Sequence, residues 1–183
     1  MKASARVVVI GGGVVGCSVL YHLVKLGWSD VMLVERSELT SGSTWHAAGG
    51  FHTLNSDTNM AALQGYTIKL YKELEELTGM SCGLHHVGGV TLADNQDRFD
   101  MLLAERAKHR YMGLETEIIG PDEIKKIAPI TNTKGIIGAL YDPLDVHLDP
   151  SGTTYAYAMA SRLGGADIEI NTNVIETNKR SDG

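Results

Sequence analysis

Hydrophobic and polar positions near the start of the chain follow a strand, helix, strand pattern. Residues 6–10 read Arg-Val-Val-Val-Ile, a β-branched run typical of a strand buried on both faces of a parallel sheet. Apolar residues then recur every three or four positions, which predicts a helix laid on that sheet and ended by Gly27. The recurring residues are Val15, Val19, Leu23 and Leu26. Residues 30–35 read as a second strand, so the pattern predicts a βαβ unit.

The later pattern alternates helices with strands. We expect further helices over residues 58–78, 95–112, 121–128 and 150–163, with Asp57, Asp94 and Asp149 as N-caps of three of them. We expect further strands over residues 84–93, 135–141 and 168–170. The first of these helices has an apolar stripe that is expected to face the core, formed by Met60, Leu63, Leu70, Leu74 and Leu77.

Composition narrows the function classes. The 183 residues carry a net charge of −6, which argues against nucleic-acid binding because that rests on a basic field. The longest apolar stretch, residues 7–20, is interrupted by glycines and is too short to indicate a membrane span. Two cysteines without a CxxC motif indicate plain thiols in a reducing compartment. With no targeting segment visible after Met1, we expect a cytoplasmic location.

A glycine motif joins the first strand to the first helix. Gly11, Gly13 and Gly16 form GxGxxG, and Glu35 ends the second strand 19 residues after Gly16. The first glycine allows a tight turn, the second lets the backbone approach a pyrophosphate, and the third lets the helix pack closely on the strand. Val14 and Val15 lie at the helix N-terminus, and Glu35 can accept hydrogen bonds from ribose hydroxyls. This predicts a dinucleotide with a free 2′-OH, either NAD or FAD, rather than a merely structural turn.

The segment of residues 37–50 is rich in small and polar residues where a simple NAD-binding unit would begin its next helix. Ala47, Ala48, Gly49 and Gly50 suit the close approach of a bulky planar ligand. Ser43 and Thr44 can offer hydroxyl and amide donors to phosphate.

From Glu35 to Gly49, through Gly42-Ser43-Thr44-Trp45-His46-Ala47-Ala48, the chain resembles amine-oxidising flavoproteins of the D-amino-acid oxidase superfamily, within it the dimethylglycine and sarcosine dehydrogenases. The resemblance continues more loosely through residues 68–71, 87–90, 138–143 and 147–150. It implies FAD attached through its 8α carbon to His46, with cofactor contacts that include Arg36, Gly42, Trp45 and Val174. In that family the flavin domain is roughly twice this length and precedes a folate-binding domain, so tetrahydrofolate would bind outside this chain.

The resemblance implies an α/β fold, namely an incomplete Rossmann-like FAD-binding domain with part of an inserted α+β substrate domain. Residues 1–183 would then form one FAD-dependent oxidoreductase domain truncated at its C-terminal end. The chain looks like an N-terminal fragment with little activity alone.

Three functions are compatible with these residues. The first is FAD-dependent oxidation of dimethylglycine or sarcosine by hydride transfer from the N-methyl carbon, with covalent FAD. The second is a non-covalent FAD enzyme of the glycine oxidase type. The third is a non-catalytic regulatory relative, as in the regulatory subunit of pyruvate dehydrogenase phosphatase. The electron acceptor, dioxygen or an electron-transfer flavoprotein, is left open.

The histidines do not predict a metal site. His85 and His86 are adjacent in an expected strand and would point to opposite faces. His52 and His147 are candidates for facing the flavin or the substrate, with an ordinary structural role as the alternative. No other catalytic residue is predicted.

Overall fold

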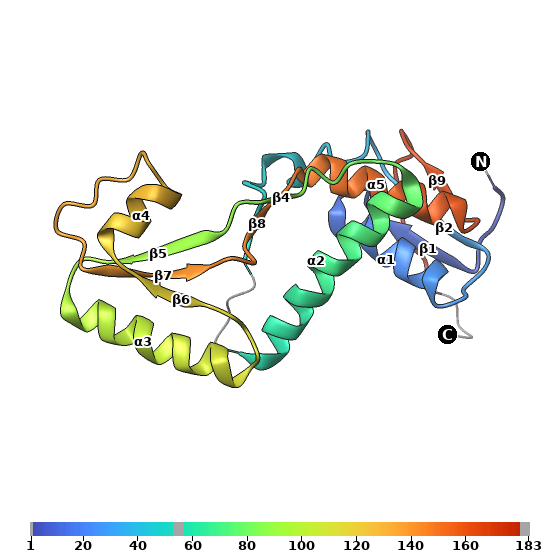
Figure 1. Cartoon of the computed structure of the whole chain (residues 1–183). Helices are drawn as coiled ribbons and strands as arrows, with labels where there is room; N and C mark the ends of the chain where they lie inside the picture. The colour runs from blue at the N-terminus through green and yellow to red at the C-terminus, as the bar shows by residue number, and fades with distance from the viewer. Residues whose placement is uncertain (1, 53–56, 180–183) are drawn as a thin grey trace. The chain divides into compact units, whose positions relative to one another are not determined.

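The computed structural model describes residues 2–52 and 57–179 (Figure 1). The chain divides into two compact units. Unit 1 consists of Met1–Gly49, Leu70–Leu84 and Leu148–Gly183, and unit 2 consists of Gly50–Lys69 and His85–His147. The chain therefore leaves unit 1 twice and returns twice, as expected for a Rossmann-like domain with an insertion.

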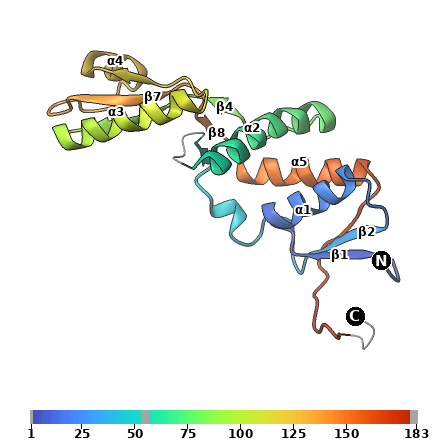
Figure 2. The same cartoon turned by 90° about the horizontal axis from the view of Figure 1, so that it is seen from below.

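Unit 1 is built on a parallel sheet with the strand order β1–β2–β9. The strands are β1 (Val7–Ile10), β2 (Val31–Val34) and β9 (Asp167–Glu169). Helix α1 (Val14–Lys25) contacts β1 and β2, and α5 (Pro150–Leu163) contacts β9 and lies beside α1 (Figure 2). Unit 1 also contains the short 3-10 turn η1 (Thr44–His46) and the part of α2 (Thr58–Thr78) from Leu70 onward. The predicted βαβ unit is confirmed.

The buried face of α1 differs from the predicted one. Cys17 and Leu20 are fully buried, and Tyr21 packs against the ring of Tyr157 in α5 at a centroid distance of 5.5 Å. The predicted stripe is wrong, because three of its four residues are exposed, namely Val15, Val19 and Leu26. Both stripes of α1 are apolar, so the spacing identified a helix but not the face that the sheet and α5 cover.

Strand β1 is not buried on both faces as predicted. Val8 and Ile10 are exposed, whereas all four residues of β2 are buried. Val8 and Ile10 alternate with the half-buried Val7 and Val9, so one face of β1 is covered and the other is open, whereas both faces of β2 are covered.

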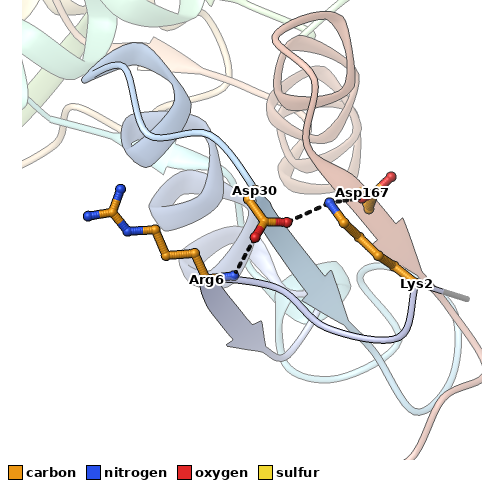
Figure 3. A network of polar contacts seen from close by, with 4 residues as sticks. All are labelled: Lys2, Arg6, Asp30 and Asp167. Atoms are coloured by element: carbon orange, nitrogen blue, oxygen red, sulfur yellow. Dashed lines mark hydrogen bonds and ion pairs between the residues drawn. The ribbon is translucent and has the colours of Figure 1, made fainter.

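Lys2 joins two strands at the end of the sheet where they begin (Figure 3). Its Nζ lies 2.6 Å from Oδ1 of Asp30 and 3.4 Å from Oδ2 of Asp167. The Asp30 carboxylate also accepts the backbone N–H of Arg6 at 3.0 Å. The hydrogen bond from Lys2 is the main cause that lowers the pKa of Asp30. These contacts hold the segment before β1 at the opposite end of the sheet from the glycine turn.

Unit 2 contains an antiparallel sheet with a helix on each face. Its strand order is β5–β7–β6, with β5 (Gly89–Ala93), β7 (Gly138–Asp142) and β6 (Glu117–Ile119). Leu140 of β7 packs with Leu102 of α3 (Gln96–Tyr111), and its neighbour Ala139 packs with Ile124 of α4 (Pro121–Ile127). A second small sheet joins β3 (Gly50–Phe51), β8 (Val146–His147) and β4 (His85–His86). The expected α+β insertion is confirmed.

Two local predictions in unit 2 are wrong. The strand expected over residues 84–93 is split into β4 and β5, because Gly88 has φ +70° and turns the chain from one sheet to the other. Asn95, not Asp94, caps α3, since its side chain accepts the N–H of Arg98 at 2.8 Å. Asp94 instead accepts a hydrogen bond from the Asn95 side chain.

Other predicted boundaries are closer. Asp57 accepts the N–H groups of Asn59 and Met60, and Asp149 accepts that of Ser151, so both act as N-caps. Strand β7 begins at Gly138 rather than at residue 135.

On α2 only part of the predicted stripe is buried: Leu70 and Leu74 are buried, while Met60, Leu63 and Leu77 are exposed.

None of the helices that the structure describes is long and apolar enough to cross a membrane.

Cys17 and Cys82 are buried free thiols. Burial raises the pKa of Cys17 to about 12 and that of Cys82 to about 11, so both stay protonated near neutral pH. A protonated, buried thiol is a poor nucleophile, which fits a structural role.

Candidate functional site

The glycines between β1 and α1 have separate structural roles. Gly11 has φ +112°, a conformation that favours glycine, and makes the turn out of β1. A Cβ atom on Gly16 would overlap the carbonyl oxygen of Gly11, so the first turn of α1 lies directly on the glycine turn. A Cβ atom on Gly12 would lie 2.9 Å from the Cβ of Glu35 and 2.7 Å from a methyl group of Leu39. Gly12 was not among the predicted site residues, although close packing also requires a glycine there.

Backbone amides gather at the N-terminus of α1. Gly13 is the N-cap and offers no side-chain cap, and the first bond within the helix runs from the N–H of Cys17 to the carbonyl of Gly13 at 3.0 Å. The N–H groups of Val14, Val15 and Gly16 precede that bond and have no partner inside the helix. The Val14 N–H donates to Oγ1 of Thr44 at 3.1 Å. This end of α1 has the donors and the positive dipole end that attract a phosphate.

The carboxylate of Glu35 lies beside the glycine turn. Its Oε2 accepts the N–H of Gly12 at 2.6 Å, and its Oε1 accepts that of Ser37 at 2.9 Å. Burial alone would raise the pKa of Glu35, but the hydrogen bonds from Gly12 and Ser37 and the charge of Arg36 outweigh it and leave the pKa below its usual value. Glu35 is therefore ionised near neutral pH, with lone pairs left to accept further hydrogen bonds.

These groups line one cavity of about 690 Å³ in unit 1. That volume is typical of small-molecule sites. Predicted cofactor residues in the lining are Gly11, Gly13, Val14, Val15, Gly16, Glu35, Arg36, Gly42, Ser43, Thr44 and Ala47. The prediction missed Val9, Ile10, Gly12, Val19 and Ser41, which the same cavity includes. Idealised Cβ atoms on Gly11 and Gly42 meet nothing within 4 Å, so backbone lies open to a ligand there.

His46 lies at the end of the turn η1 and is exposed. Its Nδ1 lies 3.1 Å from the carbonyl oxygen of Gly42, and its ring lies 3.8 Å from the ring of Trp45, centroid to centroid, with 34° between the planes. A carbonyl oxygen only accepts hydrogen bonds, so we assign the proton of the neutral ring to Nδ1. Nε2 then carries the free lone pair.

Several predicted site residues lie outside the lining of this cavity. Trp45, His46, Ala48 and Gly49 lie in the same segment of unit 1 but are not part of the lining. Gly50 belongs to β3 in unit 2. Val174 follows β9 and is 37% exposed.

The candidate catalytic histidines both lie in unit 2. Nδ1 of His52 lies 2.6 Å from Oδ2 of Asp145, whose side chain is only 8% exposed. His147 lies in β8, where it pairs with Gly50 on one side and with His85 on the other. Within residues 2–52 and 57–179, no three His, Cys, Asp or Glu side chains are arranged to hold a metal ion.

Together, the parallel sheet, its glycine turn and the acidic residue after the second strand define a Rossmann-like dinucleotide-binding fold. The family of FAD-dependent oxidoreductases called DAO matches residues 6–183, and the chain belongs to this family. Members of the family bind FAD.

Three named proteins are similar to this chain over nearly its whole length. The chain is 40% identical over 182 residues to dimethylglycine dehydrogenase of Homo sapiens, a match that covers all of this chain and 21% of that protein. It is 39% identical over 175 residues to human sarcosine dehydrogenase, covering 95% of this chain and 19% of that protein. It is 35% identical over 175 residues to the mouse (Mus musculus) pyruvate dehydrogenase phosphatase regulatory subunit, covering 96% of this chain and 20% of that protein. The chain thus spans about a fifth of the length of these relatives.

A solved structure shares the fold. L-proline dehydrogenase from P. horikoshii superimposes with a TM-score of 0.90 at 26% identity, over all of this chain and 48% of that one. The shared fold includes both the parallel sheet and the insertion.

The expected cytoplasmic location is wrong. The dimethylglycine and sarcosine dehydrogenases that match this chain are mitochondrial proteins. The expectation rested on the residues that follow Met1. They carry no information about location, because the chain spans only about a fifth of these relatives.

Proposed function

We propose that this chain holds FAD for the oxidation of an N-methylated glycine, either dimethylglycine or sarcosine. The observation that carries the proposal is the cavity in which the glycine turn, the N-terminus of α1 and Glu35 meet. The identity with dimethylglycine and sarcosine dehydrogenases across nearly the whole chain supports the substrate class.

In this proposal the pyrophosphate of FAD lies against the start of α1. The amides of Val15 and Gly16 donate to it, and the open backbone at Gly11 leaves room for the close approach. Arg36, Gly42, Ser43 and Ala47 complete the contacts on the other wall of the cavity. Val174 is proposed to lie against the adenine.

Glu35 is proposed to bind the ribose. Its Oε2 accepts the N–H of Gly12 and its Oε1 that of Ser37, and the carboxylate keeps lone pairs for the ribose hydroxyls. The carboxylate would repel a 2′-phosphate, which favours a dinucleotide with a free 2′-OH.

When bound, FAD supplies the chemistry by accepting a hydride from the N-methyl carbon of the substrate. The residues of this chain bind and orient the cofactor. His46 is proposed to attach to the 8α carbon through Nε2, because Nδ1 is engaged with Gly42. Trp45, Ala48 and Gly49 flank the attached histidine, with Gly50 directly after them in the chain.

Two further components belong to the proposed reaction. The product iminium is hydrolysed by water or trapped by tetrahydrofolate, which would bind outside these residues. An electron-transfer flavoprotein is one candidate to reoxidise the flavin, and dioxygen is the other.

Two other functions compete. A glycine-oxidase-type enzyme would hold FAD without a covalent bond. A regulatory protein would keep the fold without turnover, and the identity with the pyruvate dehydrogenase phosphatase regulatory subunit is the observation in its favour. The complete motif around His46, residues 42–49, argues against the regulatory function. A protein that only binds partners has no need of a covalent bond to flavin.

Anaerobic reduction of the flavin tests the proposal. The full-length protein, purified with its flavin, is mixed with dimethylglycine, sarcosine, glycine or no amine, and the visible flavin absorbance is followed. We expect bleaching by dimethylglycine or sarcosine and slow or no bleaching by glycine. Faster bleaching by glycine would favour the glycine-oxidase-type function, and no bleaching by any amine would favour the regulatory one.

A further inference from the structure

Thr44 connects two parts of the cavity that lie 30 residues apart in the chain. Its Oγ1 accepts the N–H of Val14, the first residue of α1, at 3.1 Å. A Cβ atom on Gly13 would lie 2.9 Å from the same oxygen. The hydroxyl of Thr44 therefore lies directly on the first turn of α1, and a glycine at position 13 allows it to do so.

The same threonine begins the turn that carries His46. The N–H of His46 donates to the carbonyl of Ser43 at 3.2 Å, and the N–H of Ala47 donates to that of Thr44 at 3.1 Å. These bonds join residues 43–47 in one hydrogen-bonded turn. Holding Thr44 on α1 therefore holds the whole turn relative to the phosphate-binding end of the helix.

We propose that Thr44 is a positioning residue for the attachment of His46 to FAD. This inference rests on the proposed tether and adds the residue that orients it. Thr44 docks the turn on α1, while the Gly42 carbonyl and the Trp45 ring fix the imidazole within the turn. Holding a nucleophile in one geometry raises its rate of reaction with a partner held nearby.

The attachment step forms one N–C bond, breaks one C–H bond and reduces the flavin by two electrons. The Nε2 lone pair forms a bond to the 8α carbon, and that carbon loses a proton. The electron pair of the broken C–H bond reduces the flavin ring. The ring or the solvent takes up the proton from carbon and the proton that leaves Nδ1. Dioxygen then removes the two electrons and two protons as hydrogen peroxide, which regenerates the oxidised flavin.

A time course of attachment tests the role of Thr44. The full-length protein is produced under riboflavin limitation and mixed with FAD, and aliquots are denatured in acid before the flavin in the washed pellet is measured. Thr44→Val keeps the side-chain volume but removes the acceptor for the Val14 N–H. We expect attachment to be about five-fold slower, as loss of one hydrogen bond implies, and Thr44→Ser to restore the rate.

Two controls separate positioning from other effects. Thr78→Val removes the hydrogen bonds of a different threonine in unit 1 and should leave the attachment rate unchanged. Thr78 Oγ1 donates to the carbonyl of Leu74 at 2.6 Å and accepts the N–H of Met80 at 3.1 Å. The reversible affinity of each variant for FAD is measured in a His46→Ala background. We expect Thr44→Val to change this affinity much less than it changes the attachment rate.

The outcomes test the positioning role of Thr44 separately from the covalent attachment of FAD to His46. Attachment at the wild-type rate in Thr44→Val would overturn the positioning role, and so would an equal loss of FAD affinity and attachment. Failure of Thr44→Ser to restore the rate would also overturn it. A wild-type protein that binds FAD but never retains it in the pellet would instead reject the tether.

Discussion

Oε2 of Glu35 accepts the backbone N–H of Gly12 at 2.6 Å, and this bond brings the end of β2 against the turn that follows β1. Any side chain at position 12 would meet the Cβ and Cγ atoms of Glu35 at 2.9 Å. The glycine is therefore needed for the carboxylate to lie where it does. The same carboxylate has lone pairs left for a ligand, so it combines a structural role with the proposed binding role.

Replacing Glu35 tests its proposed contact with the ribose. In Glu35→Ala we expect affinity for FAD to fall about ten-fold or more, since hydrogen bonds to a charged group contribute about 1.5–3 kcal/mol. The thermal midpoint should also fall, because the half-buried Glu35 carboxylate accepts the N–H groups of Gly12 and Ser37, but by less than the ribose contact adds to binding. Equilibrium dialysis and thermal unfolding of the full-length protein measure the two effects. Affinity that declines only in proportion to stability would remove Glu35 from the binding site.

Two glycine variants test the packing of α1 on the glycine turn. The Cβ atom in Gly16→Ala would overlap the carbonyl oxygen of Gly11, so we expect α1 to be destabilised by about 1–3 kcal/mol. Gly42→Ala is the matched control, because its Cβ atom meets nothing within 4 Å. Amide hydrogen exchange in α1 of the full-length protein measures the stability of this helix in both variants. Equal protection in the two variants would contradict the close contact between Gly16 and Gly11.

The cap of α3 gives a prediction with its own control. The side chain of Asn95 accepts the N–H of Arg98 in the first turn of α3. The neighbouring Asp94 instead accepts a hydrogen bond from the Asn95 side chain. Asn95→Ala should lower the free energy of opening of α3 by about 1 kcal/mol, and Asp94→Ala by clearly less. Hydrogen exchange of the first-turn amides of α3 measures the difference. A larger effect of Asp94→Ala would restore the cap that the sequence predicted.

His109 gives unit 2 a dependence on pH. Burial lowers the pKa of His109 below its ordinary value of 6.5, and the nearby carboxylates of Glu105 and Asp142 only partly oppose this. The unfolded chain therefore binds the proton more readily than the folded chain. The stability contributed by His109 is greatest well above pH 6.5 and is lost as the pH falls through 6.5 towards the folded pKa.

We therefore expect the opening free energy of α3 to fall between about pH 7.5 and about pH 5.5. The slope should be smaller in His109→Gln, which keeps a polar group that can bond to Thr116, whose Oγ1 lies 3.4 Å from Nδ1 of His109. Hydrogen exchange of the two proteins at both pH values tests this. Identical slopes would show that another group controls the pH dependence.

Features that depend on neighbouring residues were predictable from the sequence. The turn at Gly11, the helix that follows it and the acid after β2 form one continuous βαβ segment, so their spacing was enough to predict them. The N-caps Asp57 and Asp149 were also predicted, because a cap bonds within three residues of itself. Glu35 and most of the cavity lining belong to this local group.

Features that depend on distant residues were not predictable. The bond from Val14 to Thr44 spans 30 residues, and that from His52 to Asp145 spans 93. The buried face of α1 was misassigned because α5, more than 120 residues later, packs on α1, where Tyr157 contacts the ring of Tyr21. Sequence periodicity identifies a helix, but the covered face depends on what packs against it.

Mass spectrometry of the flavin-containing peptide tests the central claim most directly. The full-length wild-type protein and His46→Ala are denatured, digested and sequenced by fragmentation, with flavin fluorescence marking the modified peptide. We expect the wild type to carry flavin on the imidazole of His46 and the variant to release all its flavin on denaturation. Flavin released intact from the wild type, or found on another residue, would contradict the tether at His46.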